Sequence, residues 1–130
     1  MKLKGYHNCC NDWAVEEGTS KRLRVNKLVP FLENNNPQLI KHELISWKGK
    51  NDPSTKMDSK YSICDISFPG VICPTINPHQ LPYRMIDGAR RMAKMFIETD
   101  ITESYFYVIE PDIFYSLLED YPENLRNLFA

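Results

Sequence analysis

The segment Tyr83-Arg84-Met85-Ile86-Asp87-Gly88-Ala89-Arg90-Arg91-Met92-Ala93 decides how this chain is expected to fold. Its apolar start, Tyr83 to Ile86, predicts a strand that Asp-Gly brings to an end. From Ala89 onward, apolar residues recur at the spacing of one face of a helix. A strand followed directly by an amphipathic helix predicts a domain in which a sheet packs against helices.

The apolar face of this helix is expected to pack on the sheet. It comprises Ala89, Met92, Ala93, Phe96 and Ile97. The opposite face carries the charged residues Arg90, Arg91, Lys94 and Glu98. On this interpretation Phe96 is a core residue, and its replacement by alanine is expected to cost about 3–5 kcal/mol.

The start of the helix carries an unusual charge pattern. Arg90 and Arg91 lie in the first turn, where unpaired N–H groups already provide partial positive charge. Guanidinium groups added to those N–H groups form a natural receptor for phosphate. The alternative is a purely structural helix start, in which Asp87 caps the N–H groups and pairs with Arg91 four residues on.

Two further strands are predicted around this segment. Val71 to Ile76 is β-branched and bounded by Gly70 and Pro78, and residues 77–82 should form a hairpin-like connection to the strand at Tyr83. Ser104 to Ile109 is apolar almost throughout, which predicts an interior strand.

The other expected elements rest on weaker local signals. They are a half-buried strand over Arg22–Val29 ending at Pro30, a helix over Pro37–Ile45, a surface loop over Lys48–Ser54, and short helices over Ile113–Leu118 and Pro122–Phe129. Together they predict a small α+β domain with a mixed sheet and flanking helices.

Composition limits the classes of function. A chain of 130 residues predicts one domain, and a net charge of −1 argues against general coating of nucleic acid. No apolar run approaches the roughly 20 residues that span a bilayer, so we expect a cytoplasmic protein without a membrane partner. The four cysteines suggest neither a disulfide framework nor a metal site: Cys9 and Cys10 are adjacent, and Cys64 and Cys73 resemble small buried hydrophobes.

The order of motifs resembles the N-terminal domain of ParB-like proteins, a superfamily that includes sulfiredoxin and free-serine kinases. The likeness is carried by Ser62-Ile63, by Gly70-Val71-Ile72-Cys73-Pro74, and by the box Asp87-Gly88-Ala89-Arg90-Arg91 after the second strand. It covers roughly residues 22–110, which leaves an N-terminal arm, 1–21, and C-terminal helices, 111–130, within a single domain.

The resemblance implies a nucleotide site. Gly88, Arg90 and Arg91 would hold its phosphates, with Arg91 at the arginine that the variants of the family box share. Gly70, Val71, Cys73 and Pro74 would line the side of the base and sugar.

The chain also departs from the family pattern. Ala89 stands where the family has a glutamate associated with hydrolysis, or the sulfiredoxin cysteine, and Cys73 stands where a glutamine is common. Phosphate binding is therefore a stronger expectation than catalysis.

We therefore expect a domain that binds a nucleotide or another phosphate-bearing ligand. If it is an enzyme, phosphoryl transfer or nucleotide hydrolysis is the expected class, with Asp87 holding Mg²⁺ or orienting a nucleophile. His79 is a second catalytic candidate as a general base, against the simpler interpretation of a solvated loop histidine. The alternative function is a non-catalytic binding or regulatory protein that engages a protein or DNA partner.

Overall fold

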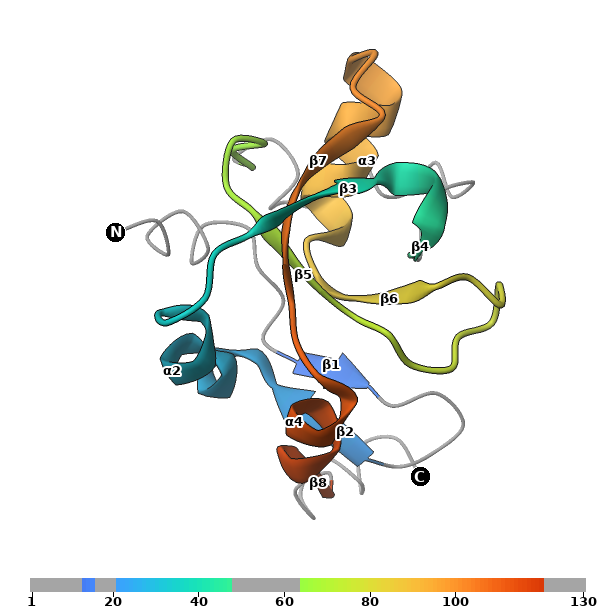
Figure 1. Ribbon diagram of the computed structural model, residues 1–130. Helices are drawn as coiled ribbons and strands as arrows, with labels where there is room; N and C mark the ends of the chain where they lie inside the picture. The colour runs from blue at the N-terminus through green and yellow to red at the C-terminus, as the bar shows by residue number, and fades with distance from the viewer. Residues whose placement is uncertain (1–12, 16–20, 48–63, 121–130) are drawn as a thin grey trace, which may run out of the picture.

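The computed structural model describes residues 13–15, 21–47 and 64–120, which form an α+β domain (Figure 1). These residues build a five-stranded mixed sheet and a separate three-stranded antiparallel sheet. The longest helix, α3 (Ala89–Glu98), packs on the larger sheet, and the smaller sheet lies near the opposite end of the molecule in Figure 1. The α+β class predicted from the sequence is thus confirmed.

The larger sheet has the strand order β3-β7-β5-β6-β4. Its strands are β3 (Gln38–Lys41), β4 (Ile45–Ser46), β5 (Gly70–Cys73), β6 (Tyr83–Asp87) and β7 (Glu103–Val108). β5 and β6 are antiparallel, as the predicted hairpin requires, while β5 runs parallel to β7 and β4 parallel to β6. β7 lies between β3 and β5, which confirms the prediction of an interior strand.

The smaller sheet joins segments from both ends of the chain. β2 (Lys21–Arg24) pairs with β1 (Trp13–Val15) on one side and with β8 (Leu118–Asp120) on the other. A 3-10 helix, η2 (Val25–Leu28), and the short helix α2 (Val29–Leu32) follow β2, and α4 (Pro111–Ser116) precedes β8.

The larger sheet separates two apolar cores, because side chains of a strand alternate between its faces. On β5, Ile72 contributes to the core beneath α3, with Met92, Ala93 and Phe106. Its neighbours Val71 and Cys73 contribute to the other core, which β2, η2, α2 and α4 cover. All of β5 is buried, so this strand is the centre of the domain.

The helix α3 has the predicted position but a different buried face. Met92 and Ala93 are buried, as predicted, whereas Phe96 is 51% exposed and Ile97 is 40% exposed. Arg91, which was predicted to lie on the opposite, polar face, is only 2% exposed. The expectation that Phe96 is a core residue was wrong, because the buried face of α3 comprises Arg91, Met92, Ala93 and Met95, and Met95 takes the buried position in that turn.

Two predictions between residues 22 and 45 were wrong. The strand that starts near Arg22 stops at Arg24, and the helical turns η2 and α2 replace its second half, with Pro30 in the first turn of α2. The helix predicted over Pro37–Ile45 is instead β3, the 3-10 helix η3 (His42–Leu44) and β4. Pairing of β3 with β7 and burial of Ile40 and Ile45 override the helical spacing of that segment.

Other element boundaries changed less. The strand predicted over residues 71–76 ends at Cys73, and the helix predicted near residues 113–118 is α4 followed by β8. Cys64 and Cys73 are buried free thiols, as predicted. The predictions for Cys9 and Cys10, the 48–54 loop and the 122–129 helix lie outside the described residues. Within the described part of the chain, no helix is long and apolar enough to cross a membrane.

Candidate functional sites

The start of α3 is built around a buried ion pair. The Nη2 atom of Arg91 donates to the Oδ2 atom of Asp87 at 3.1 Å, and the two side chains are 2% and 0% exposed. Gly88 between them is the N-cap residue, with φ of +119°, a conformation that glycine adopts without strain. The predicted pair of Asp87 with Arg91 is thus present, and the N-cap position itself is held by Gly88, which has no side chain.

Close backbone packing surrounds this helix start. A Cβ atom at Gly88 would lie 3.2 Å from the Cα atom of Gly70 and 3.3 Å from Nη2 of Arg91. A Cβ atom at Gly70 would meet the carbonyl oxygen of Asp87 and the Phe106 ring, each at 2.9 Å. Both glycines therefore allow β5, β6 and α3 to approach one another, and larger residues would force them apart.

The fold brings together only part of the nucleotide site that the sequence predicted. Gly70, Gly88 and Arg91 are adjacent, but all are buried. Val71 and Cys73 are fully buried in the core opposite α3, and burial raises the pKa of the Cys73 thiol to about 12. Pro74 is exposed just beyond β5.

Among the predicted phosphate ligands, Arg90 is the side chain with partial access to solvent. Of the two catalytic candidates, Asp87 is fully buried. His79 lies in the exposed connection between β5 and β6, and its Nδ1 atom is 2.6 Å from the hydroxyl oxygen of Ser46. Among the described residues, no group of three or more histidine, cysteine or acidic side chains could hold a metal ion.

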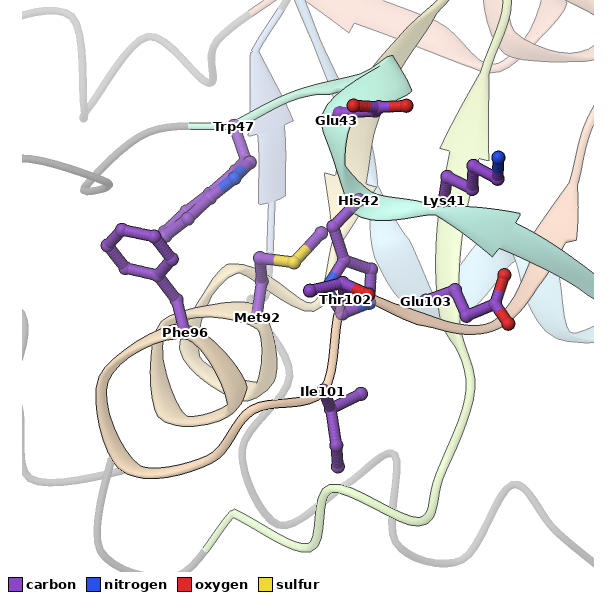
Figure 2. Close-up of a pocket in the computed structure, with 9 residues that line it drawn as sticks. All are labelled: Lys41, His42, Glu43, Trp47, Met92, Phe96, Ile101, Thr102 and Glu103. Atoms are coloured by element: carbon purple, nitrogen blue, oxygen red, sulfur yellow. The ribbon is translucent and has the colours of Figure 1, made fainter.

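A cavity of about 600 Å³ opens elsewhere, between α3 and the segment from β3 to β4 (Figure 2). Its apolar wall consists of Trp47, Met92, Phe96 and Ile101. Its polar wall consists of Lys41, His42, Glu43, Thr102 and Glu103. Figure 2 shows Trp47, Met92 and Phe96 gathered on one side, whereas Lys41 and Glu103 extend on the other.

An aromatic pair forms one wall of this cavity. The rings of Trp47 and Phe96 meet edge to face, with centroids 6.1 Å apart and an interplanar angle of 73°. Trp47 is 7% exposed and belongs to the core beneath α3, whereas half of the Phe96 side chain reaches solvent. The wall thus combines a fixed ring with an accessible one, which is the composition of a site for apolar or aromatic groups.

His42 links the cavity to the sheet. Its Nε2 atom lies 2.7 Å from the hydroxyl oxygen of Ser104, and its ring meets Phe106 edge-on at 5.9 Å. Burial lowers the pKa of His42 below its usual 6.5, and the nearby charge of Glu103 opposes that shift. The neutral imidazole is consequently the favoured form near pH 7.

The sequence did not indicate this cavity. Its walls come from residues 41–47, 92–96 and 101–103, and the first of these segments was expected to be mostly helical. The one local signal is Trp47, a large aromatic residue that is buried in the core beneath α3.

Comparison of the chain with protein-family models, curated proteins and solved structures found no match. The ParB-like resemblance therefore stays a hypothesis that rests on the short motifs between residues 22 and 110.

Proposed function

We propose that this domain is a non-catalytic binding module and that its ligand occupies the cavity beside α3. The observation that carries the proposal is the accessible Phe96 ring against the fixed Trp47 ring in a cavity of about 600 Å³. Cavities of roughly 300–1,000 Å³ lined by aromatic residues and a few polar groups are typical of sites for small ligands.

The chemistry of the walls suggests the class of ligand. A flat, mostly apolar group, such as a heteroaromatic ring, would contact Trp47, Met92 and Phe96. The neutral imidazole of His42 and the hydroxyl of Thr102 supply polar contacts that could orient such a ring. Two carboxylates and one ammonium group line the remaining wall, so a strongly anionic ligand is disfavoured there.

Thermal unfolding with flat heteroaromatic compounds tests this proposal, with adenosine, guanosine and indole as the first probes. A ligand at a hundred times its dissociation constant adds about 2.7 kcal/mol to the stability of the folded state. Stabilisation should be lost in Phe96→Ala and kept in Tyr115→Ala. The latter is a matched control, because Tyr115 is a 46% exposed aromatic residue on α4 that does not line the cavity. Equal stabilisation of both variants, or none of the wild type by any probe, would exclude the cavity as the site.

The second candidate function is binding of a nucleotide phosphate at the start of α3. One observation favours it: no acidic residue lies in the first turn of this helix, while Arg90 is partly exposed there. Catalysis with Mg²⁺ held by Asp87 is less favoured, because that carboxylate is fully buried and paired with Arg91.

Titration with ATP, with and without Mg²⁺, tests the second candidate. Loss of one charge-assisted hydrogen bond in Arg90→Ala should weaken binding roughly ten- to a hundred-fold. Arg24→Ala removes an arginine from the distant smaller sheet and serves as the control. Adenosine, which has no phosphate, should bind Arg90→Ala as it binds the wild type if the cavity is the site. Affinity for ATP that is the same in Arg90→Ala and wild type would refute the phosphate site.

A further inference from the structure

Trp47, the buried ring of the cavity wall, follows a strand that has little backbone support. β4 comprises only Ile45 and Ser46 at the edge of the larger sheet, and it pairs in parallel with Tyr83 and Arg84 of β6. A parallel pair of two residues forms few hydrogen bonds. Additional contacts must therefore fix the end of β4 and the direction of the Trp47 side chain.

One such contact comes from the connection between β5 and β6. The Nδ1 atom of His79 lies 2.6 Å from the hydroxyl oxygen of Ser46, a distance typical of a strong hydrogen bond. Ser46 is 5% exposed, whereas His79 is largely exposed. Ile45 and Trp47 both belong to the core beneath α3, so Ser46 between them points to the other side of the strand. His79 thus holds β4 from the side opposite the cavity.

The connection that carries His79 is itself well ordered by hydrogen bonds. Asn77 is 6% exposed, and its Nδ2 atom donates to the carbonyl oxygens of Thr75 at 3.0 Å and Leu81 at 2.7 Å. Its Oδ1 atom accepts from the backbone N–H of Leu81 at 3.0 Å. These three bonds close the turn around His79, so the imidazole has a fixed base from which to reach Ser46.

We propose that His79 is a positioning residue for the cavity: through Ser46 it fixes β4, and thereby places Trp47 against Phe96. This inference rests on the proposed function only where it concerns ligand binding. The inference also gives His79, which the sequence suggested as a general base, a structural role instead. His79 acts on the site from behind the strand, through Ser46.

Tryptophan fluorescence tests the inference without a ligand. The chain has two tryptophans, Trp13 and Trp47, so Trp13→Phe leaves Trp47 as the single reporter. In that background, His79→Ala and Ser46→Ala should shift the emission maximum to longer wavelength and increase quenching by acrylamide, at temperatures where both variants remain folded. His79→Gln keeps a side chain able to hydrogen-bond the hydroxyl and should restore most of the wild-type signal.

Ile76→Ala is the matched control, because Ile76 is an 89% exposed residue in the same connection. It should leave the emission of Trp47 unchanged. Unchanged emission and quenching in both His79→Ala and Ser46→Ala would overturn the inference, as would equal changes in Ile76→Ala.

Binding of adenosine and indole to the same variants separates this inference from the proposed function. If a probe binds the wild type and loses affinity in His79→Ala but not in Ile76→Ala, both are supported. If the probe binds wild type and His79→Ala equally, the positioning role is wrong and the cavity remains the site. If Trp47 moves but no probe binds even the wild type, the positioning role holds and the proposed function fails.

Discussion

The buried pair between Arg91 and Asp87 should dominate the stability of the helix start. Removing one partner takes from the other, which stays buried, its oppositely charged neighbour at 3.1 Å; breaking a buried pair in this way typically costs about 3–5 kcal/mol. Arg91→Met keeps much of the side-chain volume and Asp87→Asn keeps the shape, so each isolates the loss of charge from the creation of a cavity. With a urea m-value of about 1.5–2 kcal/mol/M for a domain of this size, each variant should lower the unfolding midpoint by roughly 1.5–3 M.

The double variant and an exposed pair provide the controls. Asp87→Asn with Arg91→Met removes both charges of the pair together, so its midpoint should lie above those of both single variants. The Lys27–Glu119 pair is shorter, at 2.7 Å, but its side chains are 44% and 30% exposed. Lys27→Met should therefore change the midpoint far less than Arg91→Met does. If the two substitutions had equal effects, Arg91 would be solvated in solution, and it would regain its predicted role as a phosphate ligand.

Three further predictions follow from burial. Met92→Ala should lower the free energy of unfolding in urea by about 2–5 kcal/mol, because Met92 is 1% exposed. Phe96→Ala should cost clearly less than the roughly 3–5 kcal/mol that is typical of a core phenylalanine, because Phe96 is 51% exposed. A larger loss for Phe96→Ala than for Met92→Ala would contradict the observed packing. Because burial lowers the pKa of His42, the unfolded chain binds a proton at higher pH than the folded chain. The free energy of unfolding is therefore unaffected by His42 above the ordinary pKa of 6.5, where the imidazole is neutral in both states. It decreases as the pH falls below 6.5, because the unfolded chain takes up the proton first. His42→Gln should flatten the pH dependence of the free energy of unfolding in that range, and an unchanged slope would refute the assignment. The Cys73 thiol, with a pKa raised to about 12, should resist iodoacetamide at about pH 8 until the protein unfolds, as peptide mass spectrometry would show.

Local sequence signals were sufficient where each element is specified by its own residues. The β-branched run of β5, the Asp-Gly at the end of β6 and the helical spacing after Ala89 gave a hairpin and a helix in the correct order. The segment from Pro37 to Ile45 had apolar residues at helical spacing but forms strands, since β7 offers β3 a partner and α3 covers Ile40. Such partners are distant in sequence, and no local pattern reveals them.

At the candidate sites, too, local spacing predicted some contacts, whereas others depend on partners that are distant in sequence. The spacing of Asp87 and Arg91 correctly predicted an ion pair, but it could not reveal that both side chains are buried, because a solvated pair has the same spacing. The cavity depends on Trp47, Phe96 and Thr102, which meet only when β4, α3 and the start of β7 are assembled. Tertiary packing therefore determines which of these side chains a ligand could reach.

The two proposed binding functions concern opposite ends of one helix, and this makes them separable. Arg90 and Phe96 are six positions apart on α3, a rise of about 9 Å. At that separation, substitutions that share no partner usually act independently. The first turn is held to the sheet by the buried ion pair, whereas Phe96, near the other end, is 51% exposed. A ligand that needs its phosphate should therefore respond to Arg90→Ala alone, and a ligand that needs only its ring should respond to Phe96→Ala alone. A nucleotide that responded to both would have to span the length of the helix between them.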